Sequence, residues 1–172
     1  MADQRAVRGP RGVPTLILVC GLPGSGKTTL ARRLAGARAA VRLCPDEWLV
    51  DLGLSLYDEP ARDRLDARLR RLADELLRLG QDVILEFGFW PRAEREQLRD
   101  RGRALGARVE LHVLDPPLDV LWARIEARNR SAHWPDRPIS RDQLELWDGL
   151  FARPTAEELA GFDGPGRPRS RR

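Results

Sequence analysis

The hydrophobic positions of this chain fall into short apolar runs that alternate with longer runs, in which apolar residues recur every three or four positions. Short apolar runs are typical of buried strands, and the longer spacing is typical of amphipathic helices. Their alternation predicts β-α units around a parallel sheet. The predicted strands are 15–20, 41–44, 82–87 and 108–114, and the predicted helices are 27–37, 60–79, one from about 91, one after 115, and 140–151.

The order of these elements indicates the fold class. No fifth apolar run precedes the C-terminal residues. We therefore expect an α/β fold of three layers, with a parallel sheet of about four strands between helices. The proline-punctuated loop at 131–138 follows the helix after 115 and suggests a helical lid.

Length and hydrophobicity predict one domain. The chain has 172 residues, of which 42% are hydrophobic, enough for one sizeable core. We expect a folded domain at 15–160, a flexible N-terminal tail at 1–14 and a basic, disordered C-terminal tail at 161–172. No apolar run reaches the roughly 18 residues of a membrane span, and the first residues do not resemble a signal peptide. The expected location is cytoplasmic, away from membranes.

The net charge of +4 and the pI near 10 at first suggest a nucleic-acid partner. The N-terminal fourteen residues carry +2 of this charge and the last twelve carry +3, which leaves −1 for 15–160. The basic character therefore belongs to the two tails. This distribution argues against a long nucleic-acid groove on the folded part, while a local one stays open.

One motif points to nucleotide phosphates. Residues Gly21, Leu22, Pro23, Gly24, Ser25, Gly26, Lys27 and Thr28 match G-x-x-x-x-G-K-[ST], between an apolar strand and an amphipathic helix. Such a loop wraps phosphates with its backbone N–H groups, at the positive end of the helix dipole. Lys27, the only lysine of the chain, would reach the β- and γ-phosphates, and Thr28 would ligate Mg²⁺. We predict ATP and Mg²⁺ as cofactors, with Thr29 completing the nucleotide-binding set.

Two acidic residues stand at predicted strand ends, where ligands of open α/β sheets bind. Asp46 follows the second strand, and we predict that it is a general base for an attacking hydroxyl. The alternative is an N-cap for a helix over 47–52. Glu86 lies near the end of the third strand. It would either contact the phosphoryl acceptor or orient water bound to Mg²⁺.

Four further residues are candidates for the site. Arg124 and Arg128 stand four apart beside the apolar stripe of one predicted helix, so they share a face. They would bring positive charge from the lid onto the transferring phosphoryl group, or else form a solvated pair. Trp48 and Trp90 follow the same strand ends as the acids. We predict that they line the acceptor pocket, with core packing as the alternative.

Together these motifs resemble the P-loop kinase family that includes zeta toxins, chloramphenicol phosphotransferase and the kinase domain of phage-type polynucleotide kinases. The resemblance covers about residues 15–151. It implies that Asp46 is the base and that Arg124 or Arg128 binds phosphate from the lid. Phage-type polynucleotide kinases place an arginine three residues after the aspartate to hold the acceptor's 3′-phosphate, whereas this chain has Leu49 there.

The sequence therefore predicts a kinase that transfers the γ-phosphoryl group of ATP to a hydroxyl of a small-molecule acceptor. One alternative is a polynucleotide 5′-hydroxyl kinase, which the near-neutral domain and Leu49 disfavour. The other is a non-catalytic ATP-binding switch that signals by loop ordering. An acid at position 46 favours an enzyme over a switch.

Overall fold

The computed structural model describes residues 12–131 and 136–164. Four parallel strands form one sheet in the order β2-β3-β1-β4. The strands are β1 (Thr15–Cys20), β2 (Val41–Leu43), β3 (Val83–Gly88) and β4 (Arg108–Val113). The helices of the described part are α1 (Lys27–Arg38), α2 (Pro45–Asp51), α3 (Glu59–Arg78), α4 (Arg92–Ala104), α5 (Leu118–Asn129), α6 (Arg141–Leu150) and α7 (Ala156–Ala160).

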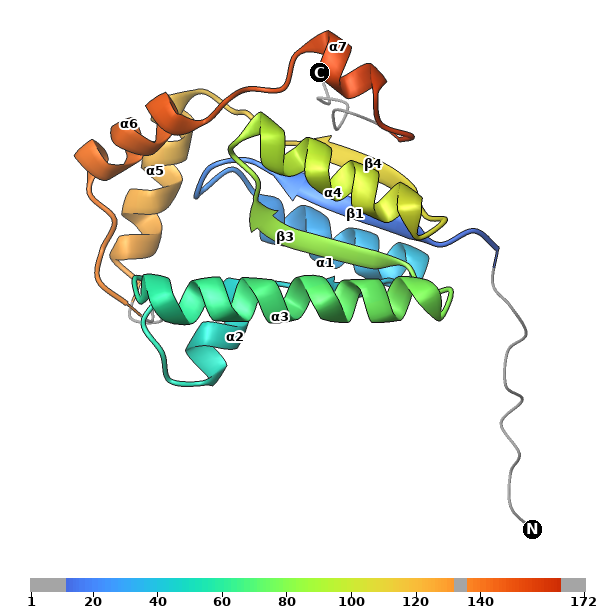
Figure 1. Cartoon of the computed structure of the whole chain (residues 1–172). Coiled ribbons are helices and arrows are strands. Elements are labelled where there is room, and N and C mark those ends of the chain that lie inside the picture. Colours follow the sequence, from blue (N-terminus) through green and yellow to red (C-terminus); the bar gives the residue numbers. More distant parts are fainter. Residues whose placement is uncertain (1–11, 132–135, 165–172) are drawn as a thin grey trace.

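The core lies on both faces of the central strand β1, whose six residues are all buried. Successive residues of a strand face opposite sides. Ile17 and Val19 pack with α1 on one face, and Leu16 and Leu18 belong to the larger cluster that includes residues of α3 and α4. Figure 1 shows the same arrangement, with α1 on one side of the sheet and α3 and α4 on the other. The predicted three-layer α/β/α fold with a four-stranded parallel sheet is confirmed.

The helices α5 and α6 form a pair at the end of the sheet to which the strands point (Figure 1). The start of α6 is set by a capping box, in which Ser140 and Gln143 bond each other's backbone N–H groups. Residues 132–135 of the predicted loop between α5 and α6 lie outside the described residues. The pair occupies the place expected for the lid.

The packed part of the chain continues beyond α6. Helix α7, which the sequence did not predict, begins after Thr155, whose hydroxyl accepts from the Glu158 backbone N–H. Phe162 is buried in the larger core cluster. The Asp163 N–H donates to the Val109 carbonyl at 2.8 Å, and the Asp163 carboxylate accepts from the Val109 N–H at 2.8 Å. Residues 161–163, expected within the tail, therefore pack against the domain.

No helix in the described ranges is both long and apolar enough to cross a membrane.

Candidate active site

The phosphate-binding loop (residues 21–28) joins β1 to α1 and depends on its glycines. Gly24 and Gly26 have φ of 79° and 98°, which L side chains rarely adopt. At Gly21, a Cβ would lie 2.5 Å from the Leu114 carbonyl oxygen. The N-cap Gly26 has no side chain to bond the first N–H groups of α1, so these donors face the loop without a cap. This arrangement suits the phosphates of a nucleotide.

Two side chains of the loop support the same interpretation. The Ser25 hydroxyl is buried and has no hydrogen-bond partner among the described residues. The Lys27 ammonium donates to the Leu22 carbonyl at 2.9 Å. Burial lowers the pKa of Lys27, and the nearby Asp46 and Glu86 carboxylates act in the opposite direction. The residues of the loop therefore fit the phosphates of a bound nucleotide.

Thr28 and Glu86 form the part of the site that fits a magnesium ion. The Thr28 hydroxyl donates to Glu86 Oε1 at 2.5 Å, and Glu86 is only 6% exposed. Hydroxyl and carboxylate oxygens are ligands that Mg²⁺ prefers, and Mg²⁺ takes its remaining ligands from phosphates and water. No cluster of three metal-ligating side chains occurs within 12–131 and 136–164. Of the two roles predicted for Glu86, this contact favours the one beside the metal.

Asp46 lies in the first turn of α2, after Pro45, and the N-cap is Cys44. The alternative prediction that Asp46 caps this helix is therefore wrong, because the helix begins one residue before it. Instead, Asp46 Oδ1 accepts from Arg62 of α3 at 2.8 Å. The carboxylate is exposed and available to a ligand.

A cavity of about 490 Å³ brings several predicted residues together. Arg128 lies half-buried on α5. Burial lowers its pKa, whereas the charge of the Asp46 carboxylate raises it. The lining includes Asp46 from α2, Thr28 from the phosphate-binding loop and Arg128 from α5. Further lining residues are Arg32, Cys44, Glu47, Val50, Asp51, Leu56 and Ser131. Three elements that are far apart in the sequence thus face one space.

Three other predicted residues lie outside the lining of this cavity. Arg124 is exposed and donates to the Gly24 carbonyl at 3.1 Å, so it contacts the phosphate-binding loop. Trp48 is 42% exposed on α2. Trp90 donates its indole N–H to the Gly21 carbonyl at 3.3 Å, and its ring lies 5.9 Å from that of Trp147. Contact of the two tryptophans with an acceptor stays a prediction.

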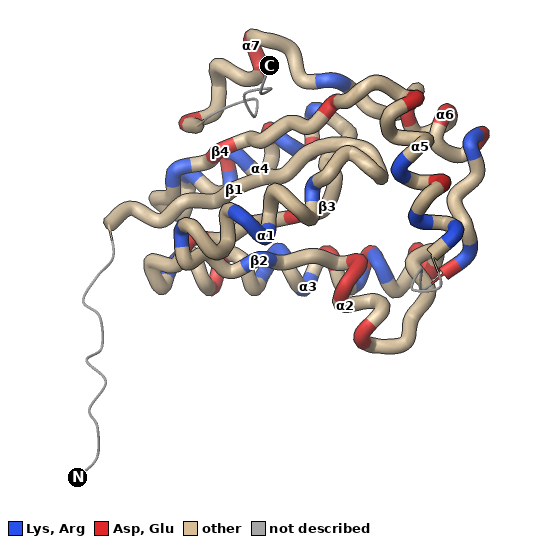
Figure 2. The backbone as a smooth tube through the Cα atoms, turned by 180° about the vertical axis from the view of Figure 1, so that it is seen from behind, with Lys and Arg blue, Asp and Glu red and all other residues tan. Residues whose placement is uncertain are grey.

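Charge around the cavity is unevenly distributed. Figure 2 shows acidic and basic positions mixed along α3, α4, α5 and α6, whereas α2 carries acidic ones only. These are Asp46, Glu47 and Asp51, and all three line the cavity. Two of these acids are paired with arginines, Asp46 with Arg62 and Glu47 with Arg32 and Arg42. Among the lining residues, Arg32 and Arg128 supply positive charge.

Several residues of the site were missed in the sequence. Arg62 contacts Asp46, and Leu56 lies in the cavity wall. The Leu56 N–H donates to Asp136 Oδ2 at 2.6 Å, which joins the loop before α3 to the segment before α6. In a chain whose 30 basic residues include a single lysine, no pattern distinguishes one arginine from another.

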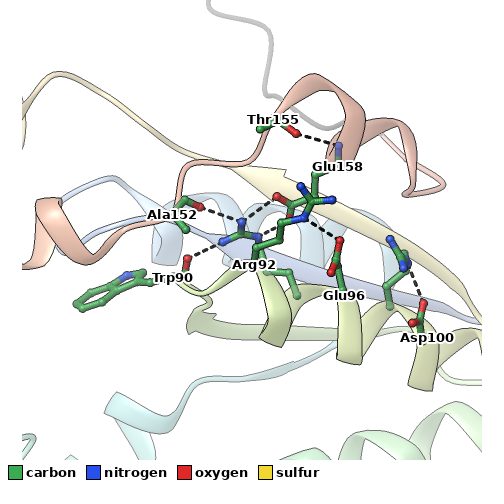
Figure 3. A network of polar contacts seen from close by, with 9 residues as sticks. Trp90, Arg92, Glu96, Asp100, Ala152, Thr155 and Glu158 are labelled. Atoms are coloured by element: carbon green, nitrogen blue, oxygen red, sulfur yellow. Dashed lines mark hydrogen bonds and ion pairs between the residues drawn. The ribbon is translucent and has the colours of Figure 1, made fainter.

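A buried charge network supports the loop after β3 (Figure 3). Arg95 is fully buried and donates to Glu158 Oε1 at 2.6 Å and Oε2 at 2.9 Å. It also donates to the carbonyls of Trp90 at 2.7 Å and Ala152 at 2.8 Å. The neighbouring Phe89 has φ of 49°, an unusual backbone for a bulky residue. The network thus fixes this loop beside the phosphate-binding loop and ties it to the segment after α6.

Comparisons with known proteins agree with this fold. No curated protein matches the chain. A candidate kinase of Chloroflexus aurantiacus J-10-fl is 26% identical, with a TM-score of 0.66 over 81% of this chain and 79% of that one. A sugar kinase of Janibacter sp. HTCC2649 is 22% identical, with a TM-score of 0.58 over 84% and 81%. A chain of the Pnkp1/Rnl/Hen1 RNA repair complex is 22% identical, with a TM-score of 0.66 over 92% of this chain and 49% of that one.

The family assignment rests on a separate match. The model of the AAA domain family matches residues 16–154, which include the phosphate-binding loop, the lid helices and all four strands except the first residue of β1. The matched part has a P-loop kinase-like fold, as the sequence predicted. The chain is therefore a member of this AAA domain family.

Proposed function

We propose that this protein is an ATP- and Mg²⁺-dependent kinase that phosphorylates a hydroxyl of a small-molecule acceptor. The observation that carries the proposal is the shared cavity. Asp46, Thr28 and Arg128 line the same space of about 490 Å³. A general base, a residue suited to the metal and a cation from the lid are therefore close to one another.

In the proposed reaction, the acceptor hydroxyl oxygen attacks the γ-phosphorus while Asp46 accepts its proton. The bond from that phosphorus to the β–γ bridging oxygen breaks, and ADP leaves. Lys27, the N–H groups of the loop and Arg128 stabilise the negative charge on the transferring group. Bound Mg²⁺ would be held at Thr28, with Glu86 beside it, and would neutralise phosphate charge. Proton acceptance by Asp46 would contribute about 10²–10⁴ in rate.

The cavity favours a small acceptor over a polynucleotide. Leu49, three residues after Asp46, is fully buried and faces the core, so this position offers no cation to a nucleic-acid phosphate. The sugar kinase among the similar folds supports a small acceptor, while the RNA repair protein makes the polynucleotide alternative one to test.

The test is a transfer assay with ATP labelled at the γ-phosphate and Mg²⁺. Candidate acceptors are sugars, nucleosides, aminocyclitol antibiotics and an oligonucleotide with a 5′-hydroxyl. We expect label on a small molecule, and at least about a hundredfold slower labelling with Asp46→Asn. Label on the oligonucleotide alone would support the polynucleotide alternative. ATP binding without transfer to any acceptor would support the switch.

A further inference from the structure

A closed series of polar contacts lies beside the cavity. The Thr28 hydroxyl donates to Glu86 Oε1 at 2.5 Å, and Arg42 Nη1 donates to Glu86 Oε2 at 2.6 Å. The other terminal nitrogen of Arg42 donates to Glu47 Oε2, and Arg32 donates to Glu47 Oε1 at 2.8 Å. Because Thr28 and Arg32 are one turn apart on α1, the series closes on itself. These contacts connect α1, β3, β2 and α2.

Arg42 is the only member that contacts both carboxylates. Its side chain is 12% exposed, and that of Glu86 is 3% exposed, so this ion pair is buried. The hydrogen bond and the charge of Glu86 raise the pKa of Arg42 although burial acts against this. The planar guanidinium reaches two acids with two nitrogens at a fixed separation, which a lysine ammonium cannot reproduce.

The two acids that Arg42 contacts have different neighbours. Glu86 bonds Thr28 at the position suited to the metal. Glu47 follows Asp46 directly, in the first turn of α2. A shift of the Glu86 carboxylate would therefore change the position of the Thr28 hydroxyl. A shift of Glu47 would change the direction in which the Asp46 side chain enters the cavity.

We propose that Arg42 is a positioning residue that joins the metal side of the site to the base. It holds Glu86 against the Thr28 hydroxyl and, through Glu47, holds the first turn of α2 so that Asp46 faces the acceptor. The second part rests on the proposed kinase function, whereas the first concerns nucleotide binding alone. Arg42 itself lies outside the cavity lining.

The experiment uses Arg42→Lys, which keeps the positive charge but replaces the two terminal guanidinium nitrogens with a single ammonium. The purified protein is titrated with ATP in the presence and absence of Mg²⁺. Without Mg²⁺, we expect ATP affinity close to that of the parent, because the phosphate-binding loop is intact. The strengthening of ATP binding by Mg²⁺ should fall by about tenfold, as for other residues that orient metal ligands. With the identified acceptor, kcat should also fall at least about tenfold.

A second variant separates the two branches. Glu47→Gln breaks only the contacts to α2, and the Glu47 side chain is 42% exposed, so the fold should tolerate this change. We expect a lower kcat with an unchanged effect of Mg²⁺ on ATP binding. Arg38→Lys is the matched control, because Arg38 donates to Glu110 at 2.8 Å near the end of α1 farthest from the loop. It should leave both quantities unchanged.

The outcomes distinguish this proposal from a purely structural role and from failure of the proposed function. A structural role predicts that Arg42→Lys and Arg38→Lys lower the melting temperature alike, with the Mg²⁺ effect and kcat within threefold of the parent; that result would overturn the proposal. If no acceptor is phosphorylated, the proposed function fails, and the ATP titrations alone decide whether Arg42 supports the metal side. An unchanged kcat in Glu47→Gln overturns the part of the proposal in which Arg42 positions Asp46 through Glu47.

Discussion

The guanidinium of Arg62 lies 2.8 Å from the Asp46 carboxylate and 3.1 Å from the Leu56 carbonyl oxygen. It joins the predicted base on α2 to α3 and to the loop in the cavity wall. Both side chains of the ion pair are partly exposed, at 62% for Asp46 and 30% for Arg62. Such a pair contributes at most about 1 kcal/mol to stability. Its value for the protein would therefore lie in the orientation of Asp46.

The first prediction separates a base from a simple ion-pair partner. Asp46→Asn keeps the size of the side chain but cannot accept the hydroxyl proton. Turnover should fall at least about a hundredfold, while ATP affinity, set by the separate loop, stays near normal. The control Arg62→Met removes the ion pair and leaves the carboxylate, so turnover should stay within about tenfold. Equal losses in both variants would show that the ion pair matters, not proton transfer.

The second prediction concerns Lys27. In this structure its ammonium donates to the Leu22 carbonyl of its own loop at 2.9 Å. Lys27→Ala should still melt close to the parent temperature, since only this one contact is lost. Phosphoryl transfer should fall at least about a hundredfold. Lys27→Arg should restore little, because a planar guanidinium fits poorly where a compact ammonium is needed. Full activity of Lys27→Ala would refute the assignment of the loop.

The third prediction separates the acceptor classes by salt. A small acceptor should show activity that changes little between 50 and 200 mM salt, whereas a polynucleotide held through several phosphates would lose about 10³–10⁵ in affinity. Removal of 165–172 is the matched variant, because it deletes four arginines and keeps the packed Phe162 and Asp163. We expect no change in activity. A steep loss after this deletion would favour a nucleic-acid acceptor.

The fourth prediction concerns a carboxyl group of α3. Asp66 lies between Arg62 and Arg70, but these arginines bond Asp46 and Glu94. Asp66 Oδ1 is buried and finds no hydrogen-bond partner in the described part of the chain. Burial raises the pKa of Asp66 from 3.8 to about 6, against the effect of the two arginines. Between these pH values the folded protein keeps a proton that the unfolded chain releases, so stability falls as pH rises.

Asp66→Asn should therefore stabilise the protein at pH 7.5. A shift of this size corresponds to about 3 kcal/mol. Partial exposure of the side chain reduces the expected gain to roughly 1–2 kcal/mol. The gain should shrink towards pH 4, as measured by urea unfolding at both pH values. Asp63→Asn, at an exposed position of the same helix, should change stability little. A gain for Asp66→Asn that is equal at both pH values would contradict the proposed ionisation.

The layers of the fold could be predicted because the strands and the longer helices show a local periodicity of hydrophobic residues. Leu69, Ala73 and Leu77 of α3 are buried as the helical spacing requires. The phosphate-binding loop could be predicted equally well, since its function depends on consecutive residues. Helix α7 was missed because it has only five residues. What fixes it is the tertiary contact of Glu158 with Arg95, which no local pattern reveals.

The acceptor side of the site was less predictable for a physical reason. Asp46 could be placed by its position after a strand, but the arginine that contacts it comes sixteen residues later on another helix. Trp90 could be placed near the site, yet its indole N–H bonds the Gly21 carbonyl. Side-chain direction and partner choice depend on the packing of several elements, and a single sequence gives only the order of those elements.

The buried pair of Arg95 and Glu158 sets a limit on how far the protein can be shortened. The family match ends at residue 154, before α7. A chain cut there would keep the guanidinium of Arg95 in the interior without its carboxylate, a loss that typically costs about 3–5 kcal/mol. Such a cost is comparable with the whole stability of a small domain. A shortened protein intended for crystallisation or assay should therefore extend at least through Asp163, even though the signature of the family is complete nine residues earlier.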